Sequence, residues 1–341
     1  MNKIIVTGGS GFIGTNLVNF LIEKKFFVIN IDKLTYSSNK YTDKNRNNRN
    51  YKFYKLDINN KKEILKIIKK HKPSTIFNLA AETHVDRSID GPKKFIDTNV
   101  LGVFNILEAL RYLKKLNTNI KLIHVSTDEV YGDIQKNLRS NENHIYQPSS
   151  PYSATKASAD HLVKSYIRTY KINAVISNCC NNYGPFQFPE KLIPKMISNI
   201  FNNKKLTLYA KGKNSREWIH VKDHCEALYT LYLKGESGES YNVGSGINYT
   251  NINLIKKILR LCKHKDIELG HKSKITFVKD RPGHDFRYAL DSRKIMRKLK
   301  WKTKINIENG LSETLDWYLK NKLFLKKISN KVYEKRLGLK I

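Results

Sequence analysis

Two groups of side chains in the middle of the chain could carry out acid–base chemistry. One pairs Tyr152 with Lys156, and the other is the run Thr127, Asp128 and Glu129. A tyrosine, with a pKa near 10, is a weak base at neutral pH, and a nearby ammonium favours its phenolate. Two adjacent carboxyl groups disfavour each other's ionisation, so one can stay protonated as an acid while the other acts as a base. Taken alone, each group could instead be solvated surface.

Local signals predict how each group is positioned. Ser150 is a plausible N-cap and Pro151 suits the first position of a helix, so Tyr152 and Lys156 fall four residues apart on one helical face. The apolar run 122–125 predicts a strand that ends just before Thr127. Ligands bind at the carboxyl ends of strands in a parallel sheet, so we expect the acidic residues in a binding site.

A glycine-rich turn near the start predicts a dinucleotide site. Gly8, Gly11 and Gly14 follow a short apolar strand and precede a helical pattern. Such glycines let the backbone approach a pyrophosphate at a helix N-terminus. Asp32 ends the second predicted strand, where its carboxylate can bind the adenosine ribose and repel a 2′-phosphate. The sequence therefore favours NAD over NADP, although Lys33 weakens that exclusion.

The first half of the chain alternates apolar runs with helical patterns, which is typical of a parallel sheet covered on both faces. We expect an α/β fold with a doubly wound Rossmann domain and a smaller, mixed α/β substrate-binding domain. After Asn182 the composition changes, and the segments become rich in Gly, Pro and aromatic residues. We place the NAD-binding domain at 1–182, with a return near 217–245, and the sugar-nucleotide-binding domain at 183–341. The basic end of the chain, 320–341, has no assigned role.

Composition excludes some classes of protein and leaves one question open. The four cysteines form no CxxC pair, so we predict neither a disulfide framework nor a metal site. We expect no leader and no membrane segment, and hence a cytoplasmic location. The net charge of +33 invites a polyanion partner, but lysines accompany asparagines and isoleucines along nearly every segment. We interpret this spread as a compositional bias and expect no nucleic-acid partner.

The chain resembles the extended short-chain dehydrogenase/reductases and, among them, the family of dTDP-glucose 4,6-dehydratases over nearly its whole length. The matching blocks are the glycine turn, 32–36, 80–88, 126–132, Tyr152 with Lys156, 181–194 and 280–285. The glycine turn and the Tyr–Lys pair mark only the superfamily. Asp128 is more specific, because related epimerases and decarboxylases typically have a small residue there. The resemblance therefore implies elimination of water, with tightly bound NAD regenerated in each turnover.

The resemblance also implies a role for each site residue. Tyr152 takes a proton from the sugar hydroxyl at carbon 4, aided by Thr127. Glu129 then removes the proton at carbon 5 while Asp128 protonates the hydroxyl leaving carbon 6. The implied cofactor residues are Gly8, Gly11, Phe12, Ile13, Gly14, Asp32, Lys33, Asp57, Ile58, Ala80, Ala81, Thr98, Tyr152, Lys156 and Asn182. The implied substrate residues are Thr83, Asn181, Lys191, Leu192, Tyr209, Arg216, Asn251, Arg281 and His284, among which the cations suit a diphosphate.

Three alternatives remain open at this stage. Thr207 stands where the family often has proline, near the expected base pocket, so the choice between thymine and uracil is undecided. A UDP-glucose 4,6-dehydratase or a sugar-nucleotide epimerase is therefore the second enzyme hypothesis. A Rossmann protein that binds polyanions without catalysis is the non-enzyme alternative. A homodimer is expected from the resemblance, through helices near 98–113 and 152–170.

Overall fold

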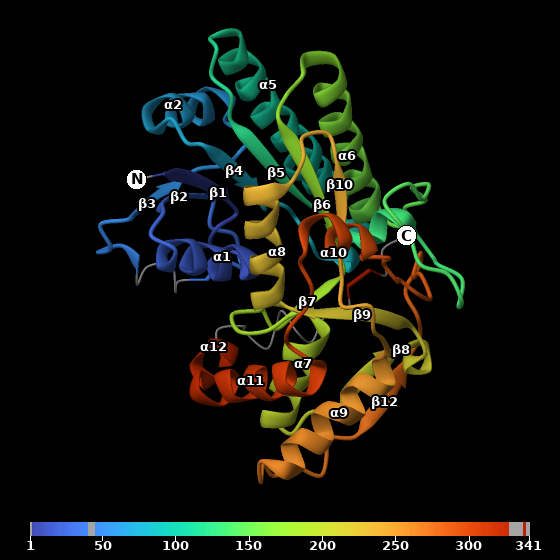
Figure 1. The fold of residues 1–341 in the computed structure, drawn as a ribbon. Coiled ribbons are helices and arrows are strands. Elements are labelled where there is room, and N and C mark those ends of the chain that lie inside the picture. The colour runs from blue at the N-terminus through green and yellow to red at the C-terminus, as the bar shows by residue number, and fades with distance from the viewer. Residues whose placement is uncertain (1, 40–44, 327–336, 339–341) are drawn as a thin grey trace.

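The computed structural model describes residues 2–39, 45–326 and 337–338, and its centre is a seven-stranded parallel sheet (Figure 1). The strand order is β10-β6-β5-β4-β1-β2-β3. The strands are β1 (Lys3–Thr7), β2 (Phe27–Asp32), β3 (Tyr51–Lys55), β4 (Thr75–Asn78), β5 (Lys121–Thr127), β6 (Ala174–Cys179) and β10 (Ser240–Val243). Every neighbouring pair is parallel. The doubly wound α/β fold predicted from the sequence is confirmed.

Helices cover both faces of this sheet, because side chains along each strand alternate between two cores. Ile4 and Val6 of β1 pack into one core with α1 (Phe12–Glu23), α8 (Val221–Lys234) and α10 (Arg293–Leu299). Ile5, between them, packs into the opposite core with α2 (Lys61–His71), α5 (Gly102–Lys115) and α6 (Pro151–Tyr170). Ligand-binding turns therefore gather at the one edge where all the strands end.

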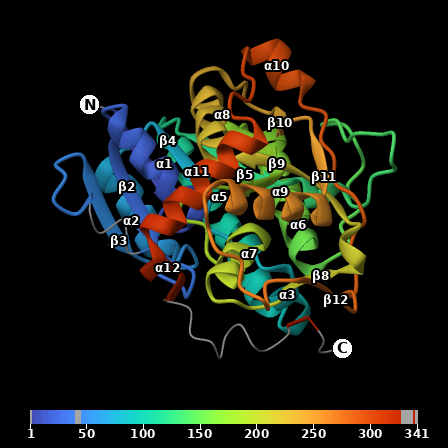
Figure 2. The same cartoon turned by 90° about the horizontal axis from the view of Figure 1, so that it is seen from below.

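The second unit lies below the carboxyl ends of the sheet in Figure 1 and is built of two small sheets and a layer of helices. One sheet has the order β11-β9-β7 and the other pairs β12 with β8. These strands are β7 (Asn181–Tyr183), β8 (Leu206–Tyr209), β9 (Ser215–His220), β11 (Asn248–Thr250) and β12 (Ile275–Val278). The helices are α7 (Leu192–Phe201), α9 (Asn251–His264), α11 (Ile307–Lys320) and α12 (Lys322–Lys326), and Figure 2 shows α7, α9 and α11 grouped together. They share a third hydrophobic core.

Short helices complete the chain between the long elements. They are α3 (Val85–Asp90), α4 (Lys93–Phe95), a π-helical turn η2 (Ile96–Leu101), and the 3₁₀ turns η3 (Asp128–Tyr131) and η4 (Ala210–Gly212). The helical pattern expected from residue 98 is thus wider than α-helical in its first turn. Among the described helices, none combines the length and apolar character that crossing a membrane requires. Of the basic end at 320–341, positions 327–336 and 339–341 lie outside the described residues.

The chain crosses between the two units more than once. After β7, α7, β8 and β9 it returns to the large sheet with α8 and β10, and β10 pairs with β6 from Ser240↔Ile176 to Val243↔Cys179. It then enters the second unit again at β11. The domain limits of 1–182 and 183–341, with a return near 217–245, therefore remain a prediction.

Candidate active site

One elongated cavity of about 270 Å³ brings the glycine turn and the acidic residues together. It runs along the carboxyl ends of the sheet strands and continues to the start of the second unit. Its lining includes Gly8, Gly11, Gly14, Asp32, Thr127, Asp128, Glu129, Tyr152, Lys156 and Asn182. Residues far apart in the sequence therefore line a single site, as the motif analysis predicted.

The glycine turn forms a tight cradle that side chains would fill. Gly8 has a φ of +69°, and a Cβ there would lie 2.7 Å from the Ala80 backbone. A Cβ on Gly14 would lie 2.1 Å from the carbonyl oxygen of Gly8. No side chain in the described part of the chain caps the start of α1, which follows Gly11 directly. The first N–H groups of α1 can therefore bind a pyrophosphate, the group such a turn accommodates.

Asp32 is held at the end of β2 by backbone donors. Its carboxylate accepts from the N–H groups of Ser10 at 3.0 Å and Leu34 at 2.8 Å. Burial raises the pKa of Asp32, and these hydrogen bonds oppose the rise. Asp32 also lines the cavity, where an acceptor for ribose hydroxyls belongs.

Lys33 turns toward acidic partners. Its ammonium donates to the hydroxyl of Thr98 at 3.0 Å and lies 3.6 Å from Asp57 and 3.4 Å from Glu82. Since two carboxylates already compensate this charge, Lys33 is poorly placed to attract a 2′-phosphate. The expected weakening of NADP exclusion is therefore not supported.

The remaining predicted cofactor residues fit a dinucleotide in the same cavity. Phe12, Ile13, Lys33, Asp57, Ile58, Ala80, Ala81 and Thr98 all line it. The glycine cradle and the uncapped start of α1 suit the phosphates of NAD. The buried carboxylate of Asp32 suits its ribose. Tyr152 and Lys156, the predicted cofactor residues on α6, line the same cavity and would hold the nicotinamide end.

The acidic residues occupy a 3₁₀ turn directly after β5. Thr127 begins the turn, and its hydroxyl oxygen accepts from the N–H of Glu129 at 3.3 Å. The Thr127 hydroxyl donates to Oδ1 of Asp128 at 3.3 Å, while Oδ2 of Asp128 is buried without a hydrogen-bond partner in the described residues. Burial, then the Glu129 charge, raises the pKa of Asp128 well above its ordinary value. Burial of Asp128 thus favours its protonated form.

Glu129 has a different electrostatic environment from Asp128. Burial raises the pKa of Glu129 as well, but the positive charges of Arg281, Arg216 and Lys191 oppose that rise. Unequal environments push the two pKa values apart, which assigns an acid and a base to neighbouring carboxyl groups. The repulsion expected from the sequence is present, with burial as the larger cause.

Tyr152 and Lys156 lie on the first turns of α6, where the predicted cap is observed. The Ser150 hydroxyl accepts from the N–H of Ser153 at 3.1 Å, and Pro151 is the first helical residue. One electrostatic expectation is wrong: the pKa of Tyr152 is raised, by burial first and the Glu129 charge second. The Lys156 ammonium donates instead to the carbonyl oxygen of Val125 at 2.7 Å. A hydrogen bond from the Thr127 side chain opposes the rise, so this site needs further positive charge to form a phenolate.

A buried polar chain lies behind Lys156, under the strand ends. The Thr7 hydroxyl donates to Asn78 Oδ1 at 2.6 Å, and Asn78 Nδ2 lies 3.0 Å from Nδ1 of His124. Nε2 of His124 lies 3.4 Å from Oδ1 of Asp160, and Oδ2 of the same carboxylate accepts from the Ser126 hydroxyl at 2.7 Å. The chain links the glycine turn to α6 one helical turn beyond Lys156.

The predicted substrate residues divide into two groups. Thr83, Asn181 and Lys191 line the cavity, and the Lys191 ammonium donates to the carbonyl oxygen of Thr83 at 2.6 Å. Leu192 begins α7 immediately afterwards. Tyr209, Arg216, Asn251, Arg281 and His284 lie outside this lining, in the second unit.

Two members of the second group contact a carboxylate that the sequence analysis left without a role. Asp86 pairs with Arg281 at 2.5 Å and accepts from the Tyr209 hydroxyl at 3.1 Å. The Tyr209 ring centroid lies 5.9 Å from that of His284. The Arg281 guanidinium beside Asp86 lowers the pKa of that carboxyl, against the effect of burial. A substrate diphosphate would therefore compete with Asp86 for Arg281.

Asn251 begins α9, and its side-chain oxygen is buried with no hydrogen-bond partner in the part of the chain described. An unsatisfied buried acceptor costs about 1–3 kcal/mol, which a ligand donor could recover.

The structure also adds cavity residues for which the sequence carried no motif. Glu190 lines the cavity and accepts from the Tyr36 hydroxyl, which lies 3.0 Å from both carboxylate oxygens. The Arg87 guanidinium lies 4.2 Å from the Tyr36 ring centroid. These contacts connect the loop after β2 to the loop before α7. The sequence pointed to Tyr36 and Glu190 only through their position inside two matching blocks, 32–36 and 181–194.

Comparisons with known proteins agree with this geometry. Residues 5–314 match the family model described as GDP-mannose 4,6 dehydratase. A dTDP-glucose 4,6-dehydratase of Haemophilus influenzae is 45% identical, with 94% of this chain and 99% of that protein covered. The crystal structure of dTDP-glucose 4,6-dehydratase from Bacillus anthracis in complex with NAD is 41% identical, with a TM-score of 0.86 over 96% of this chain and 99% of that one. The dTDP-glucose 4,6-dehydratase of Streptomyces venezuelae with NAD bound is 36% identical, with a TM-score of 0.88 over 94% and 98%.

Proposed function

The chain belongs to the dTDP-glucose 4,6-dehydratase family of extended short-chain dehydrogenase/reductases, and from this premise we propose how its residues perform the reaction. The protein is an NAD-dependent hydro-lyase that converts dTDP-glucose to dTDP-4-keto-6-deoxyglucose and water. NAD, when bound, supplies a hydride acceptor for carbon 4 and a hydride donor for carbon 6 within one turnover. The reaction therefore involves no net oxidation.

The side chains divide the proton transfers among them. Tyr152 takes the proton from the hydroxyl at carbon 4, and Thr127 stabilises its phenolate by hydrogen bonding. The ketone at carbon 4 acidifies the proton at carbon 5, which Glu129 removes. Asp128 gives its proton to the hydroxyl at carbon 6, so that the hydroxyl leaves as water. The cationic residues Lys191, Arg216 and Arg281 bind the diphosphate.

The observation that carries this proposal is the burial of the Asp128 carboxyl group beside Glu129, in a cavity shared with the glycine cradle. A carboxyl group whose pKa is raised by burial, next to a second carboxyl group whose ionised form is favoured by cationic residues, is suited to give a proton to a leaving hydroxyl. Epimerisation at carbon 4 requires no such acid. The Asp128–Glu129 pair therefore favours elimination over the epimerase alternative.

Mass spectrometry of nucleotide sugars tests the assignment directly. Purified protein incubated with dTDP-glucose, without added reductant, should give a product lighter by one water. A parallel incubation with UDP-glucose covers the alternative that Thr207 leaves open. Loss of water from UDP-glucose alone would move the enzyme to that nucleotide, and loss from neither would refute the dehydratase mechanism.

We also propose a homodimer that uses the helices near 98–113 and 152–170. Large apolar side chains along them are exposed in the single chain: Leu101 is 48% exposed, Tyr112 44% and Tyr170 39%. A second copy could cover them. Light scattering coupled to gel filtration should give twice the chain mass, and L101E should reduce it.

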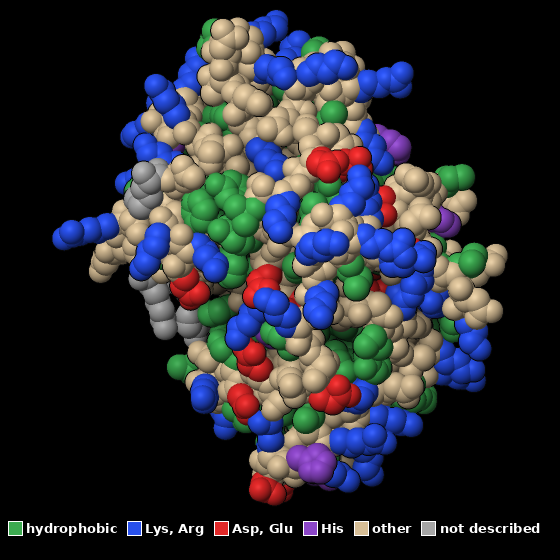
Figure 3. Space-filling view, in the orientation of Figure 1, with side chains coloured by type: hydrophobic (Ala, Val, Ile, Leu, Met, Phe, Trp, Pro, Cys, Tyr) green, Lys and Arg blue, Asp and Glu red, His purple; other side chains and the backbone are tan. Residues whose placement is uncertain are grey.

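A cytoplasmic location and the absence of a nucleic-acid partner complete the proposal. All four cysteines are free and buried, as expected for a reducing compartment. In Figure 3 lysine and arginine side chains are scattered over the whole visible face, with acidic side chains among them. A polyanion-binding surface would instead gather them in one patch or stripe. A shallow dependence of nucleic-acid retention on salt would agree with this interpretation.

A further inference from the structure

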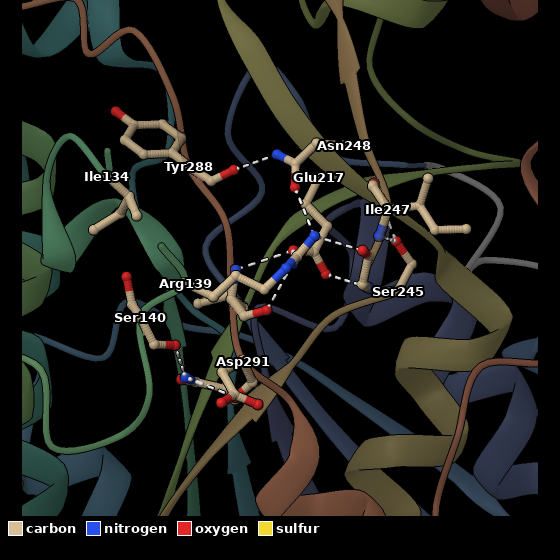
Figure 4. A network of polar contacts seen from close by, with 12 residues as sticks. Ile134, Arg139, Ser140, Glu217, Ser245, Ile247, Asn248, Tyr288 and Asp291 are labelled. Carbon is tan, nitrogen blue, oxygen red and sulfur yellow. Dashed lines mark hydrogen bonds and ion pairs between the residues drawn. The ribbon is translucent and has the colours of Figure 1, made fainter. Parts of the chain in front are cut away.

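An ion pair between the half-buried Arg139 and the buried Glu217 connects the second unit to the segment that follows the acidic turn (Figure 4). Glu217 of β9 is 0% exposed, and its Oε2 accepts from the Arg139 guanidinium at 2.9 Å. Its oxygens also accept from the N–H groups of Gly246 at 2.7 Å and Leu290 at 3.0 Å. Arg139 in turn donates to the carbonyl oxygen of Leu290 at 2.8 Å and to the Asn248 side chain at 3.0 Å. Hydrogen bonds to these neighbours thus fix both side chains of the pair.

The pair joins four segments that are distant in sequence. They are the loop 132–140, strand β9, the turn 244–248 and the segment 285–291. The loop 132–140 and strand β9 contain Arg139 and Glu217 themselves. The turn 244–248 and the segment 285–291 contact the pair through backbone groups. A Cβ on Gly244 would lie 2.1 Å from Oε1 of Glu217, so the turn packs directly on the carboxylate.

On one side the pair supports the diphosphate-binding arginine. Arg216 precedes Glu217 on β9, and side chains alternate along a strand, so Arg216 faces away from the pair. Its guanidinium donates to the carbonyl oxygens of Asp285 at 2.8 Å and Phe286 at 3.1 Å, and lies 4.1 Å from the Tyr288 ring centroid. The Glu217 contact with Leu290 fixes the segment that holds Arg216 in place.

On the other side the pair is connected to the acidic turn. The Tyr131 hydroxyl donates to Oδ1 of Asn242 at 2.9 Å. Nδ2 of Asn242 donates to the carbonyl oxygens of Ser140 at 2.8 Å and Asp291 at 3.3 Å, which directly follow Arg139 and Leu290. Tyr131 ends the 3₁₀ turn that contains Asp128 and Glu129. Through Asn242 of β10, two of the four segments, 132–140 and 285–291, are therefore connected to the acidic turn, and the second of them also holds Arg216.

We propose that the Arg139–Glu217 pair is a positioning element that fixes the distance between the Asp128–Glu129 turn and Arg216. A nucleotide sugar held by its diphosphate then presents carbons 5 and 6 to the base and the acid. This inference rests on the proposed function, because it assigns the pair to the same elimination reaction. Neither residue lines the cavity, so we assign both a positioning role that acts through their neighbours.

The charge of Glu217 adds an electrostatic contribution. The groups that act on Asp128 are Glu129 from its own turn, Glu217 and Arg216 from β9, and Thr127. Three further groups interact with the Asp128 charge. They are the thiol of Cys179 in β6, the thiol of Cys180 directly after that strand, and the hydroxyl of Tyr152 on α6. Glu217 raises the pKa of Asp128, whereas Arg216 lowers it. Removing the Glu217 charge should therefore let Asp128 lose its proton at a lower pH.

The test compares three variants with the wild-type enzyme by measuring dTDP-glucose dehydration across pH. E217Q removes the charge, whereas E217D and R139K keep it and disturb only the geometry. In E217Q we expect KM to rise about tenfold, which corresponds to about 1.4 kcal/mol, and the alkaline limb of kcat to move to lower pH. In E217D and R139K we expect the rise in KM with the alkaline limb at the wild-type position.

A matched control is E239Q, which breaks the ion pair of Glu239 with Lys294 at a half-exposed site outside the cavity. It should behave like the wild type. If E217Q folds but leaves KM within twofold of E239Q and the alkaline limb unmoved, the proposal is wrong. If E217Q does not fold, E217D and R139K decide, and unchanged KM in both would overturn the proposal. Wild-type dehydration in the same assay separates these outcomes from failure of the proposed function.

Discussion

Replacing Asp128 by asparagine should separate catalysis from stability, with opposite effects on the two. Asparagine keeps the shape of the side chain and can accept the hydrogen bond that Thr127 donates at 3.3 Å. It cannot give up a proton. Positioned acid–base groups contribute about 100- to 10,000-fold in rate, so D128N should lose that factor in kcat. The corresponding barrier increase is about 3–5 kcal/mol.

The stability effect follows from the pKa of Asp128. Burial and the Glu129 charge raise it in the folded protein, whereas the unfolded chain has the ordinary value of about 3.9. Above that pH, folding must bind a proton that the unfolded chain has lost, at about 1.4 kcal/mol per pKa unit. D128N avoids this cost, so it should melt at a higher temperature than the wild type at pH 7. The advantage should shrink as the pH falls toward 4, where about half of the unfolded chains also carry the proton.

Two measurements, with one control variant, test the predicted loss of activity and the predicted gain in stability. Dehydration is followed by mass spectrometry, and melting by circular dichroism at pH 4 and pH 7. The control is D223N on α8, since Asp223 also has a pKa raised by burial but lies outside the cavity, where it accepts from the backbone N–H groups of Lys304 and Ile305. D223N should keep wild-type activity. Dehydration by D128N within tenfold of the wild type, or a lower melting temperature at pH 7, would refute the assignment of Asp128 as a buried, protonated acid.

Three further changes probe the cofactor and hydride-transfer parts of the site. Y152F should lose at least about 100-fold in kcat and show no reduced-nicotinamide absorbance on adding substrate, whereas D128N should accumulate that absorbance; equal spectra would contradict the order of steps. D32N should weaken NAD binding about tenfold in calorimetry, about 1.4 kcal/mol, and unchanged affinity would remove Asp32 from the ribose site. G14A should fail to retain NAD through gel filtration, because its Cβ would lie 2.1 Å from the Gly8 carbonyl oxygen; an occupied variant would show that the turn can relax.

The fold was predictable because its signals are local. The strand expected from the apolar run 122–125 forms the middle of β5, since a short apolar run carries that signal by itself. The start of α6 was predicted to the residue, because Ser150 and Pro151 carry the capping chemistry themselves. The π-helical turn at 96–101 was not, since no residue type specifies it.

The candidate site was only partly predictable, and for a different reason. Motifs identified Asp128, Glu129 and Tyr152, and the structure places all three on one cavity. Their electrostatics depend on burial, which spacing does not reveal, so the direction of the Tyr152 pKa shift was missed. Glu217 and Arg139 lie 78 positions apart, and no local pattern predicts their contact.

The position of β10 affects how this protein can be made. The strand at the end of the large sheet, beside β6, comes from residues 240–243, after the chain has built β7, α7, β8 and β9 elsewhere. During translation the edge of β6 therefore stays unpaired while the ribosome adds some sixty residues, from Cys179 to Ser240. An open edge is a template for pairing with other chains. Slow synthesis through this stretch prolongs that exposure, and the nascent chain depends on rapid completion, or on a chaperone, until α8 and β10 arrive.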